Sequence, residues 1–221
     1  MTPHPAPLIL GPLMFSGIVE TTSKTQALLE SSHADLLRFT LSRPQNFTDL
    51  HIGDSVACNG VCLTVEAFTD KDIQFALGKE TLKVTGWTPE GIKTMTWNLE
   101  RSLKLGDRIH GHIVTGHVDF VGQVTQSDAG PESLSLRISF PFEQSPYFWP
   151  KGSVCLNGVS LTLNEVGENF FEVHLIPETL KTTNLGTLKP GDRVNVEIDS
   201  FARGWVHYFK EKGTPRGTSL R

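Results

Sequence analysis

Cysteine is scarce in this chain, and its scarcity removes two classes of site. Only Cys58, Cys62 and Cys155 occur among the 221 residues. An odd, sparse set of cysteines is a poor disulfide framework, and no Cys-x-x-Cys pair is present to form a zinc site. Because free thiols persist in a reducing environment, the expected location is the cytoplasm.

Long apolar runs and an excess of positive charge are also missing. No apolar run approaches the roughly 18 residues that a membrane-spanning helix needs, so no membrane partner is expected. The formal net charge of −4 and the pI of about 6.1 argue against a nucleic-acid partner, which usually requires a basic face. The composition, 38% hydrophobic and 20% charged, is typical of a soluble globular chain with one large or two small domains.

The two ends of the chain differ from the rest. Residues 1–13 are proline-rich with one short apolar stretch, and they lack the basic start and long apolar core of a signal peptide. We therefore interpret residues 1–13 as an N-terminal extension outside the fold and expect it to be disordered. Residues 213–221 are expected to form a disordered tail.

An internal repeat organises the remaining sequence. Residues 55–64 (SVACNGVCLT) match residues 153–162 (SVCLNGVSLT) at an offset of 98 residues (153 − 55), and the same offset aligns two copies of the sequence ETLK. Shorter matches extend upstream and downstream. Two domains of similar size are therefore predicted, one over about residues 14–109 and the other over about residues 110–200.

Each copy has the pattern of a small β domain. Residues 38–41, 73–77 and 171–175 alternate apolar and polar residues, as strands with one buried face do. Residues 14–20 also resemble a strand. Several short strands separated by glycine-containing turns predict a small antiparallel barrel or sandwich in each copy.

The last element has a different period. Aromatic residues recur at helical spacing over residues 201–212, which predicts a C-terminal helix. Asp199 or Ser200 is a suitable N-cap for this helix. Gly204 within it lowers the helix propensity.

The Asn-Gly pair at residues 59–60 predicts a tight hairpin turn, because both residue types tolerate a positive φ. After the turn, alternate residues are apolar, whereas Cys62 and Thr64 fall on the opposite face of the strand. The second copy places Ser160 and Thr162 in the equivalent positions. Two interpretations stay open: a wall that binds a ligand, or a half-exposed strand whose outer face is merely polar.

The two copies differ at positions that could carry chemistry. Cys62 matches Ser160, and a lone cysteine is more often a small buried hydrophobe than a nucleophile. His117 matches Ile18, so a candidate acid or base occurs in one copy only, although a surface histidine is the commoner case. These differences indicate two sites for the same ligand with different tasks. They predict that Cys62→Ser costs more activity than Ser160→Ala.

Two further histidines raise the question of a metal site. His110 and His112 fall on one face of a predicted strand. No further ligand follows at a sensible spacing, so no metal is expected.

A Glu-Thr pair follows an apolar strand end in each copy, at residues 80–81 and 178–179. A carboxylate and a hydroxyl at such a position can hold a polyol chain by hydrogen bonds. The sequence Glu-Thr-Leu-Lys is also a good helix start. Both interpretations are compatible.

Five motifs together resemble those of riboflavin synthase: residues 14–20 (MFSGIVE), 59–65 (NGVCLTV), 111–119 (GHIVTGHVD), 157–162 (NGVSLT) and 175–179 (LIPET). The resemblance spans about residues 14–209, in order, and includes the duplicated lumazine-binding domain of the family's alpha-chain type. One departure is local. The linker at residues 86–97 lacks the Asn-Leu-Gly pattern that residues 184–186 keep.

The resemblance implies an all-β fold of two tandem six-stranded antiparallel Greek-key barrels followed by a C-terminal α-helix. It implies a homotrimer formed through the helix at residues 201–212, using Phe201, Trp205 and Tyr208, with each active site between the N-terminal barrel of one subunit and the C-terminal barrel of its neighbour. An association with lumazine synthase is a further expectation.

The implied reaction is the last step of riboflavin biosynthesis. Two molecules of 6,7-dimethyl-8-ribityllumazine dismutate by transfer of a four-carbon unit, and the products are riboflavin and 5-amino-6-ribitylamino-pyrimidinedione. No metal or redox cofactor is expected.

The family's site residues carry over by motif match in two groups. The first lumazine site is expected to comprise Gly17, Ile18, Val19, Cys62, Leu63, Thr64, Ala76, Leu77, Gly78, Lys79, Glu80 and Thr81. The second is expected to comprise Gly116, His117, Val118, Lys151, Ser160, Leu161, Thr162, His174, Leu175, Ile176, Pro177, Glu178 and Thr179. The candidate catalytic residues are Cys62, His117 and Ser160, while Phe15 and Asp199 match family positions linked to activity.

Two other functions are weighed against this one. A non-catalytic lumazine- or flavin-binding protein of the antenna type would use the same fold, but such relatives tend to lose the chemistry in one barrel, and both copies here keep their motifs. A generic nucleic-acid-binding barrel is disfavoured by the negative charge and by the lack of a basic aromatic platform.

Overall fold

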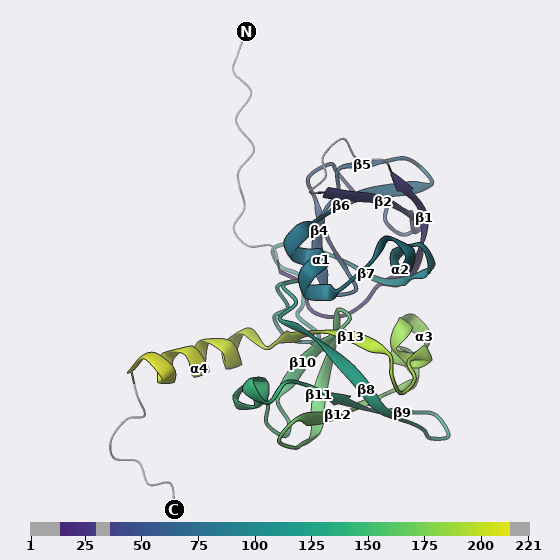
Figure 1. Ribbon diagram of the computed structural model, residues 1–221. Coiled ribbons are helices and arrows are strands. Elements are labelled where there is room, and N and C mark those ends of the chain that lie inside the picture. Colours follow the sequence, from purple (N-terminus) through teal and green to yellow (C-terminus); the bar gives the residue numbers. More distant parts are fainter. Residues whose placement is uncertain (1–13, 30–35, 213–221) are drawn as a thin grey trace, which may run out of the picture.

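The computed structural model describes residues 14–29 and 36–212. The predicted extension at residues 1–13 and the predicted tail at residues 213–221 therefore lie outside the described residues. Two β-barrels follow one another along the chain, and a C-terminal helix projects from the second barrel (Figure 1). No helix of the described residues is long and apolar enough to cross a membrane.

The N-terminal barrel is a seven-stranded antiparallel sheet in the order β4-β3-β7-β1-β2-β6-β5. Two short helices, α1 (Lys79–Thr85) and α2 (Pro89–Thr94), lie between its last two strands. The strands are β1 (Thr21–Leu29), β2 (Leu36–Ser42), β3 (Ser55–Cys58), β4 (Val61–Thr64), β5 (Ala67–Phe68), β6 (Asp72–Gly78) and β7 (Thr96–Arg101).

The C-terminal barrel is closed, with six strands in the order β10-β11-β12-β9-β8-β13. The strands are β8 (Phe120–Ala129), β9 (Leu134–Ser139), β10 (Ser153–Leu156), β11 (Val159–Val166), β12 (Phe170–Leu175) and β13 (Arg193–Ile198). The helical elements are the 3-10 helices η1 (Phe142–Tyr147) and η2 (Asn184–Thr187), α3 (Pro177–Thr182) and the C-terminal α4 (Ser200–Lys212).

The N-terminal barrel has seven strands instead of six because one of its strands is interrupted and forms β4 and β5. Only residues 65–66 separate β4 from β5, and together these strands match β11 at the repeat offset of 98. β5 pairs with β6 as Ala67↔Gln74, and β11 pairs with β12 as Glu165↔Glu172, the equivalent residues. Both copies therefore share one Greek-key strand order, as predicted.

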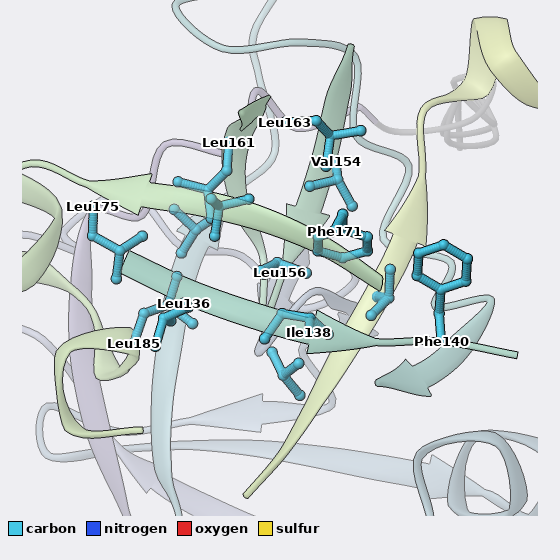
Figure 2. Packing of buried hydrophobic residues seen from close by; sticks show 14 of the residues in the cluster. Leu136, Ile138, Phe140, Val154, Leu156, Leu161, Leu163, Phe171, Leu175 and Leu185 are labelled. Carbon is cyan, nitrogen blue, oxygen red and sulfur yellow. The ribbon is translucent and has the colours of Figure 1, made fainter. Parts of the chain in front are cut away.

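Each barrel has its own apolar core, built from the inward-facing residue of every second position. In the C-terminal barrel, Phe171 packs between other aromatic rings, 5.6 Å from Phe140 and 5.0 Å from Phe148 between centroids. Figure 2 shows side chains from β9, β10, β11 and β12 converging on this core. In the N-terminal barrel, Phe39 stacks on Trp97 with ring centroids 5.0 Å apart.

The two predicted hairpin turns touch each other at their tips. Asn59 and Asn157 have φ values of 47° and 45°, and the glycines that follow them also have positive φ. A Cβ on Gly60 would lie 2.7 Å from the backbone nitrogen of Gly158, and a Cβ on Gly158 would lie 2.9 Å from that of Gly60. Glycine is required at both tips because any side chain would separate the barrels.

The strand-like run at residues 14–20 is not a regular strand, which corrects that part of the prediction. Phe15 forms a single bridge with Val114, the equivalent residue of the second copy. The next backbone N–H groups of the run bond to a side-chain carboxylate instead of a neighbouring strand, so no ladder continues.

The first residues of each copy are exchanged between the barrels. Val19 belongs to the core of the C-terminal barrel, and Val118 packs against the core of the N-terminal barrel. We call residues 15–19 and residues 114–118 the crossing segments. The two sequence repeats are therefore not separate in space where they begin.

The predicted C-terminal helix and its cap are confirmed. α4 begins at Ser200, and the backbone N–H of Phe201 donates to the Asp199 carboxylate at 2.8 Å. Asp199 is thus the N-cap. Helix α4 projects from the C-terminal barrel (Figure 1) but keeps contact with it, because Ala202 is buried in the core and Lys210 Nζ lies 5.5 Å from the Tyr147 ring centroid.

Candidate functional site

A buried glutamate holds each crossing segment in place. Glu100, on β7, accepts hydrogen bonds from the N–H and hydroxyl of Ser16 at 2.7 and 2.8 Å and from the N–H of Gly17 at 3.0 Å. Glu197, on β13, does the same for Thr115, at 2.6 and 2.7 Å, and for Gly116, at 2.9 Å. Two equivalent carboxylates thus fix two equivalent turns.

Each turn delivers a carbonyl group to the opposite barrel. Gly17 and Gly116 have positive φ values of 74° and 78°. The carbonyl of Gly17 accepts from the N–H of Ser160 at 2.8 Å, and that of Gly116 accepts from the N–H of Cys62 at 2.8 Å. A Cβ on Gly17 would lie 2.6 Å from the Ser160 Cβ, so the close approach also requires glycine.

These contacts bring the predicted site residues together in a different grouping from the one that the resemblance implied. The crossing segment with Gly17 lies at Ser160, in the C-terminal barrel, and the segment with Gly116 lies at Cys62, in the N-terminal barrel. We define the N-barrel group as Cys62, Leu63, Thr64, Ala76, Leu77, Gly78, Lys79, Glu80, Thr81, Gly116, His117 and Val118. We define the C-barrel group as Gly17, Ile18, Val19, Lys151, Ser160, Leu161, Thr162, His174, Leu175, Ile176, Pro177, Glu178 and Thr179.

Only part of each group offers a side chain to a ligand. The outward-facing members, such as Thr64 and Thr162, are exposed, and Cys62 and Ser160 are half-buried beside them. Ile18 and Ile176 are also exposed, whereas five other apolar members are buried in the cores: Val19, Leu63, Leu77, Leu161 and Leu175. These five residues can reach a ligand through their backbone alone.

The sequence did not reveal a hydrogen-bond partner of Ser160. His112 Nδ1 lies 2.7 Å from the Ser160 hydroxyl, and its Nε2 is buried without a bond to any described residue. Burial lowers the pKa of His112, which keeps the imidazole neutral and able to take a proton. A signal did exist: like His117, His112 has no histidine counterpart in the first copy.

Burial also favours the neutral form of the Cys62 thiol. Burial raises the pKa of Cys62, and the nearby carboxylate of Glu197 adds to that effect. A thiolate is therefore scarce at neutral pH, which disfavours a nucleophilic role. Cys62 fits better as a small, half-buried packing residue than as a nucleophile.

The two histidines that were considered for a metal site, His110 and His112, have different surroundings in the structure. His110 is exposed, whereas His112 turns toward Ser160. Across residues 14–29 and 36–212, no group of three or more His, Cys, Asp or Glu side chains could hold a metal ion.

Lys151 is held in a conformation that few side chains adopt. Its φ is 71°, and the equivalent residue of the first copy is Gly53, with a φ of 96°. A left-handed conformation costs a residue with a Cβ about 1–2 kcal/mol. The exposed lysine therefore occupies a position where glycine would fold more easily, and such backbone strain clusters at functional sites.

The Glu-Thr pairs lie in helices, as one of the two interpretations predicted. Glu80 and Glu178 fall in the first turns of α1 and α3. Both carboxylates are exposed, so their position at a helix start leaves them accessible to a ligand.

A cavity of about 830 Å³ lies elsewhere, between residues 49–55 and residues 101–109, and it includes none of the candidate residues. The candidate groups instead occupy open faces of the barrels. Concavity alone is therefore a poor guide to the site in this chain.

A family model for the lumazine binding domain matches residues 16–102 and, a second time, residues 115–199. The riboflavin synthase of Brucella abortus (strain 2308) is 39% identical over 199 residues, which cover 86% of this chain and 95% of that protein. The chain belongs to the riboflavin synthase family. The riboflavin synthase of Escherichia coli (strain K12) is 38% identical over 189 residues, covering 84% of this chain and 87% of that protein.

Solved structures agree with this riboflavin synthase fold. LumP complexed with riboflavin matches 84% of this chain and 99% of its own, with a TM-score of 0.75 and 24% identity. LumP complexed with 6,7-dimethyl-8-(1'-D-ribityl) lumazine has a TM-score of 0.72 and 25% identity over the same shares of the two chains.

Glu100 gives this riboflavin synthase family member a testable pH dependence. Burial raises the pKa of Glu100 from 4.5 to about 7, although the bonds from Ser16 and Gly17 oppose the rise. Between these values the folded state binds more protons than the unfolded state, so stability falls as pH rises. From pH 4.5 to pH 7, the native free energy of unfolding should fall by about 2 to 3 kcal/mol relative to that of Glu100→Gln.

Urea unfolding of both proteins over this range measures the effect. The raised pKa of Glu197 acts on both proteins alike and cancels in the difference. If the free energy of unfolding of the native protein instead rose with pH relative to that of Glu100→Gln, the hydrogen bonds to Glu100 would outweigh the effect of its burial.

Proposed function

We propose that this chain is a riboflavin synthase. It converts two molecules of 6,7-dimethyl-8-ribityllumazine into riboflavin and 5-amino-6-ribitylamino-pyrimidinedione by moving a four-carbon unit from one to the other. The observation that carries the proposal is the presence of two equivalent groups of ligand-facing residues in one chain, which lies in the riboflavin synthase family.

Two equivalent groups suit a reaction between two copies of one molecule. Both groups offer a threonine after the hairpin and a Glu-Thr pair in a short helix, and each is completed by a crossing segment from the other copy. Binding two reactants in a fixed mutual orientation can supply about 7–11 kcal/mol of the barrier in favourable cases. The residues that the two groups share bind the common ligand. The residues in which the groups differ make one ligand molecule the donor and the other the acceptor of the four-carbon unit.

We assign the proton transfers to residues that differ between the two groups. Next to the C-barrel group, neutral His112 accepts the proton of the Ser160 hydroxyl and so prepares it to attack an electrophilic carbon or to activate a water molecule. In the N-barrel group, His117 is exposed next to the Cys62 position and is the candidate acid or base. Lys151 supplies a positive charge to the C-barrel group.

A homotrimer would cover the open faces of both groups. Helix α4 exposes 62% of Phe201, 62% of Trp205 and 51% of Tyr208 to solvent in the single chain. Apolar side chains gathered on a projecting helix suit a contact between subunits. We place each active site between the N-barrel group of one subunit and the C-barrel group of its neighbour.

The remaining expectations concern the surroundings of the enzyme. Three thiols without a disulfide among the described residues suit the cytoplasm. An association with lumazine synthase, which would deliver substrate, stays a prediction that co-elution of the two proteins can test.

A second candidate function is an antenna-type protein that binds a lumazine or flavin without turnover. The likeness to LumP, a protein solved with riboflavin and with the lumazine, favours this alternative. The family relatives named riboflavin synthase and the intact residues of both groups favour the enzyme.

We expect the purified chain to form riboflavin from 6,7-dimethyl-8-ribityllumazine alone. Two lumazine molecules should disappear for each riboflavin that forms, and a chelator should not slow the reaction. Absorbance and green fluorescence follow both compounds. Tight lumazine binding without riboflavin formation would support the antenna function instead.

The contacts of Ser160 and Cys62 reverse the order of effects that the sequence alone suggests. Ser160→Ala and His112→Ala should each lower kcat by a factor on the order of 10² to 10⁴. The double variant should lose little more, because the two residues act as a unit. Cys62→Ser, which copies the residue of the other barrel, is the matched control and should lose less. Additive losses at His112 and Ser160 would contradict the pairing.

Trp205→Glu should convert the trimer into monomers of 24.4 kDa and abolish turnover, because each active site needs two subunits. His207→Glu introduces the same charge on another face of α4 and is the matched control. Light scattering after size exclusion gives the mass. A Trp205→Glu protein that stays trimeric would exclude α4 as the main contact.

A further inference from the structure

Five asparagines meet at the interface between the two barrels. Four of them form two pairs related by the repeat, Asn59 with Asn157 and Asn98 with Asn195. The fifth, Asn184, has no asparagine counterpart, because the first copy has Gly86 at the equivalent position. One side of a nearly symmetric interface thus carries an extra polar side chain.

The paired asparagines form a symmetric set of bonds between the hairpins. Asn98 Nδ2 donates to the carbonyl of Asn157 at 2.9 Å, and Asn195 Nδ2 donates to the carbonyl of Asn59 at 2.8 Å. Within each barrel, the side chain of the hairpin asparagine accepts from the backbone of its partner strand, at 2.8 Å and 2.9 Å. These bonds hold the two hairpin turns against each other.

Asn184 uses its full hydrogen-bonding capacity in this interface. Its Nδ2 donates to Asn59 Oδ1 at 2.9 Å and to the carbonyl of Thr96 at 2.9 Å. Its Oδ1 accepts from Asn98 Nδ2 at 3.0 Å and from Asn157 Nδ2 at 3.3 Å. Its backbone N–H donates to Asn98 Oδ1 at 2.7 Å. A side-chain amide bonded to three other side chains and one backbone carbonyl is strongly fixed in position.

The equivalent place in the first copy has a weaker connection. Gly86 ends α1 with a φ of 63°, and a Cβ there would lie 2.5 Å from Arg193 Nη2. The Arg193 guanidinium donates to the carbonyl of Thr85 at 3.4 Å, near the limit for a hydrogen bond. The end of α1 packs against β8, but fewer hydrogen bonds tie it to the other barrel than tie the end of α3.

The side of the interface that contains Asn184 is connected to residues of the C-barrel group. Asn184 follows α3, and the Thr183 hydroxyl donates to the carbonyl of Thr179 at 2.7 Å. On the other side, Asn59 opens the hairpin that leads to Cys62. A continuous series of bonds thus runs from Thr179, through Asn184, to the hairpin of the N-terminal barrel.

We propose that Asn184 is a positioning residue that fixes α3 and its Glu178-Thr179 pair against the N-terminal barrel, so that the two ligand groups are held with unequal stiffness. The C-barrel group is preorganised, and the N-barrel group keeps a freer α1. The proposal rests on the proposed function in one respect, namely that Glu178 and Thr179 contact the ligand.

Riboflavin is the probe, and NMR of the full-length chain with a ¹⁵N label reads the two groups separately. The amides of Thr81 and Thr179, equivalent residues of α1 and α3, report the N-barrel and C-barrel groups. The midpoint of the riboflavin titration followed at the Thr179 amide should rise about tenfold in Asn184→Ala. The reason is that α3 must then become ordered when the ligand binds. At Thr81 the midpoint should change less than twofold.

Asn195→Ala is the matched control, because it removes a bond of the same interface without touching α3. It should shift both midpoints by the same factor, and thermal unfolding of both variants separates a general loss of stability from the local effect. Equal midpoint shifts at Thr81 and Thr179 in Asn184→Ala, or no shift at either, would overturn the proposal. Absence of turnover in the native chain would count against the proposed function while leaving the Asn184 result intact.

Discussion

The exchange of the crossing segments depends on two buried carboxylates, and the candidate sites depend on that exchange. Glu100 and Glu197 each gather the N–H groups of a tight turn that no strand could pair. Several short hydrogen bonds offset part of the cost of burying each carboxylate, although burial still raises both pKa values. Without them, the carbonyls of Gly17 and Gly116 would not reach the opposite barrels, and neither ligand group would be complete.

Much of the fold follows from local pattern in the sequence. The repeat, the alternation after each Asn-Gly pair and the aromatic spacing of α4 correctly predict the barrels, the hairpin faces and the C-terminal helix. These features arise from periods of two and 3.6 residues, which act over short distances. The capping role of Asp199 follows from the same kind of local chemistry.

The arrangement of the site was less predictable, because it depends on contacts between residues far apart in the chain. The run at residues 14–20 has the composition of a strand, yet Glu100 takes its N–H groups from across the chain. The partnership of His112 with Ser160 likewise joins two motifs that look unrelated in sequence. Periodicity identifies faces, but it does not say which barrel a segment will join.

The exchange also bears on how such a chain could arise. Each crossing segment meets the other copy through equivalent bonds, so two separate chains of one copy each could make the same contacts as an isologous pair. Joining them in one polypeptide replaces an association that depends on concentration with an intramolecular one. Duplication also frees the halves to diverge. A symmetric ancestor would have to carry the same residue at both hairpins, whereas the joined chain can hold a thiol at one and a histidine-bonded hydroxyl at the other.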